Sequence, residues 1–286
     1  MRRSVGTQRL RALEIVTMWA ATAGLALCSL PVAADESPDL LNEPFYVALG
    51  SFILSSDTVV RLDGEAQRGD QVDFENTFGG GDLTRFRVDG YWRFADKHKI
   101  RALWFNSSRT KSRVLDEDIT WGDEVFPVHA ETKSKVAFDI YELAYEYAFL
   151  RRDNYEVSGT AGLHYTQFET TLSAKASSSG GTLDHDISQK GSVGAPLPVF
   201  GLRGMWRLPH DFWFDASAQI FALSIDEYSG NIQDYRAAVF WQPKTWLGLG
   251  LGYNRFAVNV DVDKDRFKGS LDWTYRGPML FYSGAF

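Results

Sequence analysis

Residues 267–286 read Phe267-Lys-Gly-Ser-Leu-Asp-Trp-Thr-Tyr-Arg-Gly-Pro-Met-Leu-Phe-Tyr-Ser-Gly-Ala-Phe286, and this stretch decides the fold. Apolar and aromatic residues alternate with polar ones through most of it, which indicates an amphipathic β-strand. The apolar residues take odd positions first and even positions later, namely Leu271, Trp273, Tyr275, Leu280, Tyr282 and Phe286. We therefore expect a change of phase within the strand, for which Gly277-Pro278 could supply a β-bulge.

Nine further segments show the same kind of pattern. With the last one they are predicted as strands near 44–55, 84–94, 99–109, 135–149, 155–168, 196–207, 212–225, 232–241, 246–260 and 266–286. Segment 99–109 is compatible with either facing. Helical periodicity is sustained nowhere, and no later run approaches the roughly 18 apolar residues of a spanning helix, so the chain is assigned to the all-β class.

The connections between these segments alternate between short and long. Short turns are predicted at 95–98, 151–154, 209–212 and 242–245, and they carry typical turn residues. On the other side lie three long connections, 56–83, 110–134 and 169–195, and two brief ones, 226–231 and 261–265. The predicted strands are even in number, and both ends of the array fall on the short-turn side. A soluble β-sandwich has no reason to alternate loop length in this way.

The apolar faces of the segments are about nine to eleven residues long, which is the length of a tilted strand that crosses lipid. Aromatic residues gather where these faces meet the short turns, at Trp92, Phe94, Tyr147, Phe149, Tyr155, Phe212, Trp241 and Trp246. Such a girdle is typical of a membrane interface.

The chain thus resembles the bacterial outer-membrane β-barrel proteins, over residues 44–286 and at the level of architecture. The resemblance implies a Gram-negative, transmembrane, up-and-down antiparallel β-barrel of ten strands, with short periplasmic turns and three larger mobile extracellular loops. It also implies contact with outer-membrane lipid and lipopolysaccharide. Insertion by the barrel-assembly machinery is implied as well, with Tyr282 and Phe286 in the C-terminal assembly signal. A soluble periplasmic β protein is the alternative.

Residues 1–34 are predicted to be an export signal peptide, followed by a short N-terminal segment, 35–43, and by the barrel, 44–286. The signal has an apolar core at 15–27, a small-residue cleavage site at 32–34 and a positive region containing Arg2, Arg3, Arg9 and Arg11. A core of this length is shorter than the roughly 20 residues of a spanning helix. Cys28 leaves open a lipoprotein anchor, although Leu27 stands where a small residue is expected.

Removal of residues 1–34 would take away four Arg and one Glu from the 30 basic and 37 acidic residues of the whole chain. The mature chain would then have 26 basic and 36 acidic residues and a net charge of −10. This balance argues against nucleic-acid binding. The only Cys would leave with the signal, so no disulfide is expected within the mature chain.

Charged residues in the strands are expected to face a lumen, because an Arg that faces lipid at mid-membrane costs about 2–4 kcal/mol. The predicted network contains seven residues of each sign, Arg85, Arg87, Asp89, Arg93, Glu142, Glu146, Glu156, Arg203, Arg207, Asp215, Asp234, Arg236, Asp272 and Arg276. Barrels of about eight strands are filled by side chains. A salt-bridged, closed lumen is therefore the main expectation, and a narrow charged pathway or a small ligand pocket at the outer mouth is the alternative.

Two groups of residues are candidates for catalysis. Asp184-His185-Asp186 could supply a base and an orienting carboxylate. With the ten-strand count, this is similar to half of the site of the omptin proteases, which oppose paired acids to an Asp/His pair. No matching acidic pair is identifiable, and Asp116 and Asp118 are loop candidates only. His164 on an inward face, with Ser158 and Thr160, is more simply explained as polar filling of the lumen.

Motifs for metal or phosphate binding are weak. Asp261-Val-Asp263-Lys-Asp265 superficially resembles a calcium loop, but Arg266 stands where the EF-hand turn needs Gly, and the flanks are predicted strands. The run 79–81 of three Gly lacks the Lys-Ser/Thr of a phosphate loop. We therefore expect no catalytic residue, metal or cofactor.

The sequence predicts an integral outer-membrane barrel with a non-enzymatic structural or surface-interaction role, or a narrow solute pore. An outer-membrane enzyme that acts at the extracellular rim, either an omptin-like protease or a lipid-modifying hydrolase, is the alternative.

Overall fold

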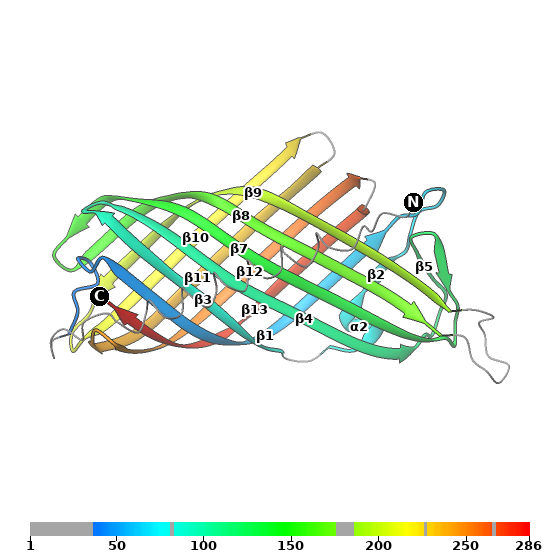
Figure 1. Cartoon of the computed structure of the whole chain (residues 1–286), viewed down its shortest axis with the longest axis horizontal. Helices are drawn as coiled ribbons and strands as arrows, with labels where there is room; N and C mark the ends of the chain where they lie inside the picture. The colour runs from blue at the N-terminus through cyan, green and yellow to red at the C-terminus, as the bar shows by residue number, and fades with distance from the viewer. Residues whose placement is uncertain (1–36, 81–82, 176–185, 226–227, 265–266) are drawn as a thin grey trace, which may run out of the picture. The chain divides into compact units, whose positions relative to one another are not determined.

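The computed structural model describes the chain from residue 37 onward, except 81–82, 176–185, 226–227 and 265–266. Ten antiparallel strands form a closed ring (Figure 1). They are β1 (Phe45–Leu62), β3 (Leu83–Ala95), β4 (His98–Val114), β7 (Glu131–Arg152), β8 (Tyr155–Ala174), β9 (Ile187–Arg207), β10 (Phe212–Ile225), β11 (Tyr228–Lys244), β12 (Leu247–Lys264) and β13 (Phe267–Ala285). The predicted signal peptide lies outside the described residues and stays a prediction.

The first and last strands of the ring pair with each other, so the sheet has no free edge. β1 and β13 keep one antiparallel register from Tyr46–Ala285 to Leu62–Gly269, with a gap in the pairing opposite Gly277-Pro278. Next to the Tyr46–Ala285 pair, the Phe45 amide donates to the Phe286 carbonyl at 2.8 Å, and the Phe286 amide donates to the Phe45 carbonyl at 2.9 Å. Closure therefore satisfies the backbone groups that an open sheet would leave unpaired.

The strands are strongly tilted, as Figure 1 shows. Pairing partners followed once round the ring from Phe45 lead back to β1 at Asp57, 12 positions further along the strand. With ten strands, this stagger corresponds to a tilt of about 40° and to a height of about 2.5 Å per residue.

Several strands are much longer than the sequence predicted. β7, β8 and β9 have 22, 20 and 21 residues. β8 and β9 take in 169–174 and 187–195 of the predicted connection 169–195, and β4 and β7 take in both ends of 110–134, at 110–114 and 131–134. The outward side chains of these extensions are charged or polar, as at Lys133, Glu169 and Lys190, and this made the extensions look like loops. Their inward side chains are mostly buried, some apolar, such as Leu172 and Ile187, and some polar, such as Thr132 and Thr170, so the strands continue. The expectation of three large mobile loops was wrong for these stretches.

The first two long connections also contain folded elements, at the end of the barrel opposite the short turns. We call the two ends the long-loop end and the short-turn end. One connection forms β2 (Gln71–Asp73) and α2 (Phe74–Phe78), and the other forms the hairpin of β5 (Ile119–Trp121) and β6 (Glu124–Phe126). Together they cap the long-loop end with an apolar core.

The β2–α2 segment completes the barrel wall. β3 stops pairing with β1 at Leu54–Leu83, and β2 takes its place further along β1. Glu75 of α2 then contacts the strands on either side of this segment, β1 and β4. Its carboxylate accepts from the Thr58 amide of β1 at 2.6 Å and from the Thr58 hydroxyl at 3.0 Å, and it forms an ion pair with Arg109 of β4.

The C-terminal strand keeps one phase throughout. Odd-numbered residues of β13 face inward from Leu271 to Ala285, and the register with β1 and β12 has no bulge at Gly277-Pro278. The predicted change of phase was therefore wrong. Polar residues appear on the outward face where the strand rises toward the long-loop end, and this mimics a phase change in the sequence.

We predict that Glu75→Gln loosens the β2–α2 segment. The substitution leaves Arg109 without its ion-pair partner in the wall, which should cost about 1–3 kcal/mol. The measurement is the rate of tryptic cleavage after the exposed Arg68, together with the urea midpoint of the folded barrel. Glu117→Gln at an exposed position is the matched control. Equal cleavage rates in the two variants would contradict the role of Glu75.

Candidate functional site

The interior of the barrel is the candidate functional site, because it gathers nearly all of the predicted charged residues. Near the short-turn end Glu156 accepts a hydrogen bond from Arg93 at 2.9 Å and forms a second ion pair with Lys99. The Lys99 ammonium also lies 3.3 Å from Glu146. All four side chains are buried. The lysine thus joins two carboxylates that come from different strands, β7 and β8.

A second part of the network is centred on Asp89. Its carboxylate accepts from Arg87 at 3.3 Å and from Arg236 at 3.1 Å, and Arg101 lies at 3.5 Å. Arg101 also donates through Nε to Glu146 at 2.6 Å, which connects the two parts. These contacts cross the lumen from β3 to β11, so the network binds opposite walls together.

The remaining charged residues form smaller groups. Arg203 of β9 and Asp215 of β10 form a two-pronged ion pair, with distances of 2.9 and 2.6 Å. Glu142 accepts from the Gln219 amide at 2.7 Å. A third contact joins the Asn254 amide to Asp234, and Arg87 donates to the same Asn254 at 3.2 Å. Buried ion pairs of this kind are stable only when hydrogen bonds satisfy both partners.

The structure thus places most of the predicted network inside the barrel. Two members lie near its ends: Arg85 is half-buried and donates to Ser107 at 3.1 Å, and Arg207 is exposed, with its guanidinium 5.8 Å from the centre of the Trp213 ring. Asp272 and Arg276 are on the outward face, so the expectation of a lumenal position was wrong for these two. Both residues were expected inside because a change of phase was predicted within this strand, and β13 keeps one phase throughout.

Sequence reasoning missed Lys99 and Arg101, which are central to the network. They belong to segment 99–109, whose facing was left open. The cost of placing Arg against lipid was the signal that could have decided it, because only one facing puts both cations inside. Ile100 and Trp104 then face outward, as the structure shows.

Residues 38–41 lie in the short-turn mouth of the barrel. Leu40 and Leu41 are buried, and the Tyr91 hydroxyl donates to the Leu40 carbonyl at 2.7 Å. Arg151 donates to the Leu41 carbonyl and also forms an ion pair with Asp96 of the β3–β4 turn. This mouth is therefore occupied by the chain itself.

Aromatic side chains fill the long-loop half of the interior. The Trp273 ring stacks on Phe138 with a centroid distance of 3.5 Å and packs edge-on against Phe256 at 5.6 Å. Above them, Trp121 of β5 is fully buried and packs edge-on against Phe74 of α2 at 5.7 Å. The folded connections thus extend the apolar core into the cap.

The candidate catalytic groups are not assembled in the described part of the chain. Asp184 and His185 lie outside the described residues, whereas Asp116 forms an exposed ion pair with Arg113 at 2.8 Å and Asp118 accepts from the Val128 amide at 2.7 Å. His164 is stacked on Phe256, and its Nδ1 lies 3.2 Å from the Thr166 hydroxyl.

Ser158 contacts Glu156 at 3.4 Å and is not paired with His164. Of the predicted hairpin acids, Asp263 pairs with Lys268 at 3.3 Å, and Asp265 lies outside the described residues. Among the residues that the structure describes, no group of three or more His, Cys, Asp or Glu is arranged to hold a metal ion.

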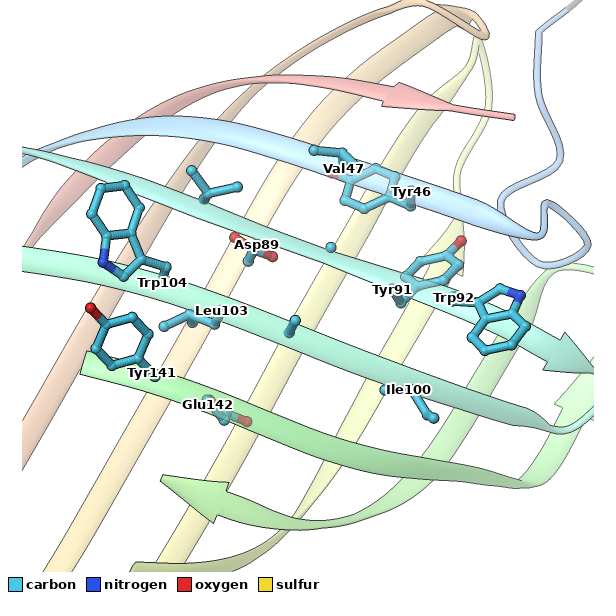
Figure 2. A pocket seen from close by; sticks show the side chains of 13 residues that line it. Tyr46, Val47, Asp89, Tyr91, Trp92, Ile100, Leu103, Trp104, Tyr141 and Glu142 are labelled. Carbon is cyan, nitrogen blue, oxygen red and sulfur yellow. The ribbon is translucent and has the colours of Figure 1, made fainter. Parts of the chain in front are cut away.

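The outward face carries a shallow groove of about 560 Å³ over β3 and β4 (Figure 2). Gly90 and Ala102 pair directly at its floor, and Trp92, Trp104 and Tyr141 stand at its rim. A side chain at Gly90 would not fit, because a Cβ there would lie 2.4 Å from the Tyr46 carbonyl oxygen. The groove is apolar and belongs to the wall, not to the lumen.

The predicted girdle residues lie on this outward face. Most are exposed, among them Trp92, Phe149, Phe212 and Trp241. A second ring of aromatic residues faces outward nearer the long-loop end and consists of Phe86, Trp104, Tyr141, Tyr165, Tyr235 and Tyr253. We call the two rings the lower girdle, at the short-turn end, and the upper girdle. No described helix is long and apolar enough to cross a membrane.

Solved structures with a similar fold are outer-membrane proteins. The outer membrane protease OmpT from Escherichia coli aligns with a TM-score of 0.54 and 12% identity, over 88% of this chain and 100% of OmpT. The fold is that of the bacterial outer-membrane β-barrels. At this identity the likeness to OmpT concerns the fold alone.

Two further matches have lower TM-scores. The toluene transporter TodX of P. putida gives 0.34 at 10% identity over 90% of this chain and 93% of TodX, and the attachment invasion locus protein Ail of Yersinia pestis gives 0.35 at 9% identity over 83% and 98%. No protein-family model and no curated protein matches the chain.

We predict that Arg203→Met destabilises the barrel by about 3–5 kcal/mol, because it leaves the Asp215 carboxylate buried and unpaired. The double variant Arg203→Met, Asp215→Leu should recover most of this loss. The measurement is the urea midpoint of unfolding in detergent. Lys190→Met, which breaks an exposed ion pair with Glu169, is the control and should cost no more than about 1 kcal/mol. A cost for Arg203→Met as small as that of the control would contradict a desolvated network.

Proposed function

We propose that the protein is a closed, non-conducting outer-membrane barrel with a non-enzymatic structural or surface-interaction role. The observation that carries this proposal is the filling of the lumen at three levels. The chain occupies the short-turn mouth with Leu40 and Leu41, the charge network joins opposite walls in the middle, and aromatic residues fill the long-loop half.

A solute pathway through this interior would have to break the network. Each buried ion pair that loses a partner costs about 3–5 kcal/mol, and the pairs are linked through Lys99, Arg101 and Asp89. A ten-stranded barrel also lies near the size at which side chains alone fill the interior. These considerations favour the closed barrel over the narrow solute pore.

The same proposal sets the location and orientation. A Gram-negative outer membrane would surround the wall between the two girdles, which are separated by ten residues on β8, from Tyr155 to Tyr165. On β7 the girdle members Tyr147 and Tyr141 are six residues apart. At about 2.5 Å per residue the separation of the girdles is therefore about 15–25 Å, and its upper value matches the apolar band of such barrels. The short-turn end would face the periplasm. We further propose insertion by the barrel-assembly machinery, with Tyr282 and Phe286 in the signal.

The long-loop end would then project outside the cell as a folded cap. Its apolar core fixes the backbone, and its surface exposes polar and charged side chains such as Glu65, Asp70, Glu117 and Asp123. Loops held by a rigid scaffold are well suited to binding. The cap is therefore the surface on which we expect a partner to dock.

We predict no stable single-channel conductance when the full chain is inserted into a planar bilayer. The double variant Arg87→Ala, Glu142→Ala should also be silent, because the aromatic layer and the Leu40–Leu41 segment still close the barrel. Insertion is verified separately by heat-modifiable migration and by protection from protease.

Conductance in the wild type that changes in the double variant would overturn the closed barrel and support a narrow pore. Cleavage of a peptide by the wild type that is lost in His185→Ala would support the enzyme alternative instead.

A further inference from the structure

Two arginines interrupt an otherwise uncharged outward wall. Between the two girdles, the described outward positions of all ten strands carry apolar, aromatic, small or uncharged polar residues, with His98 at the lower end of β4. The exceptions are Arg255 of β12 and Arg276 of β13, which are both exposed. On β7 the first outward charge, Asp139, comes only beyond Tyr141 of the upper girdle.

The two arginines are direct neighbours. Arg255 and Arg276 are a cross-strand pair in the register of β12 and β13, which places their Cβ atoms about 4.5–5.5 Å apart. Like charges in this position repel each other. Neither side chain forms an ion pair or a hydrogen bond with any residue that the structure describes. The nearest outward acids along β1 and β13, Asp57 and Asp272, lie beyond them toward the long-loop end.

Both arginines lie at the level of the upper girdle. Arg255 pairs across strands with Tyr235 of the upper girdle, and Arg276 pairs with Arg255 on the next strand. Because arginine side chains are long, their guanidinium groups can extend further toward the long-loop end.

We propose that Arg255 and Arg276 together bind a phosphate group of a lipid headgroup in the outer leaflet, namely the phosphorylated glucosamine of lipopolysaccharide. The inference rests on the proposed outer-membrane location. A phosphate between the two guanidinium groups removes their repulsion and accepts two-pronged hydrogen bonds from each. It also supplies the counter-charge that a cation at the edge of lipid requires.

Neighbouring side chains fit a sugar phosphate. Ser55 pairs with Arg276 on the other side, and Tyr235 pairs with Arg255, so both are outward neighbours of the two cations. Tyr253 precedes Arg255 by two residues on the same face and is half exposed. The apolar wall below, with Leu251 and Leu280, is fully available to acyl chains. A membrane lipid provides both parts, whereas a soluble anion provides only the phosphate.

The test is a binding titration of the folded full chain in neutral detergent, read by native mass spectrometry. The probes are lipid A with two phosphates, the dephosphorylated form of the same lipid, and inorganic phosphate. The variant is Arg255→Gln, Arg276→Gln. The matched control, Lys135→Gln, Lys190→Gln, removes two outward positive charges beyond the upper girdle.

We expect the phosphorylated lipid to bind about tenfold or more weakly to the arginine variant than to the wild type, because two charge-assisted contacts are lost. The control should stay within about twofold of the wild type, since its lysines lie outside the site. The dephosphorylated lipid should bind the wild type and the arginine variant equally, and millimolar inorganic phosphate should not displace the lipid.

Equal affinity of the wild type and the arginine variant for the phosphorylated lipid would overturn the inference. Displacement by inorganic phosphate alone would also overturn it, since the site would then be one for free anions. A dimer that is lost in the arginine variant would do the same, because a second copy of the chain would be the occupant.

A second measurement needs no variant. The phosphorylated lipid should raise the thermal unfolding temperature of the wild type, and the dephosphorylated lipid should not. In lipid-free detergent the arginine variant should be at least as stable as the wild type, because the repulsion is gone. A barrel that inserts into bilayers but shows no dependence on lipid phosphate would overturn this inference alone. Failure to insert would instead overturn the proposed function.

Discussion

The structure depends on one constraint, which is that every backbone amide and carbonyl within a membrane must find its partner inside the protein. For a sheet this requires closure, and the pairing of β1 with β13 provides it over almost the full length of both strands. Closure with ten strands and a stagger of 12 residues fixes the tilt, and the tilt fixes which residues share a level on the wall. The position of the girdles and of the outward arginines follows from this geometry.

The interior obeys a second form of the same requirement. A barrel of this size leaves too little room for bulk water, so polar side chains that point inward must satisfy one another. In the short-turn half ion pairs that cross the lumen, such as Arg236 with Asp89, meet most of this requirement, while some guanidinium nitrogens of Arg93, Arg101 and Arg236 have no hydrogen-bond partner among the described residues. In the long-loop half the wall has left the apolar band, yet the interior becomes aromatic, around Trp273 and Phe138. The barrel is thus filled by charge in one half and by apolar packing in the other.

Alternation in the sequence was sufficient to predict the barrel, the number of strands and most of the lumenal charges, because a period of two is a local property of the chain. The prediction failed where the polarity of the residues changed on both faces of a strand at the same level. Beyond the upper girdle the outward residues become polar, so β7 and β8 looked like loops and β13 looked as if it changed phase. Alternation also could not reveal the contact of Glu75 with Thr58 and Arg109, because this contact depends on how a connection folds back onto two strands.

The cost of removing a charge from water bears on both the inward arginines and the outward pair. The rule that strand arginines avoid lipid placed Arg87, Arg93, Arg203 and Arg236 correctly inside, and each of them is paired there. Arg255 and Arg276 cannot follow the rule, because the unbroken phase of β12 and β13 turns them outward. Inside, each charge has a carboxylate supplied by the chain. Outside, no described carboxylate pairs with Arg255 or Arg276, and this difference is what leads us to propose a partner from the membrane.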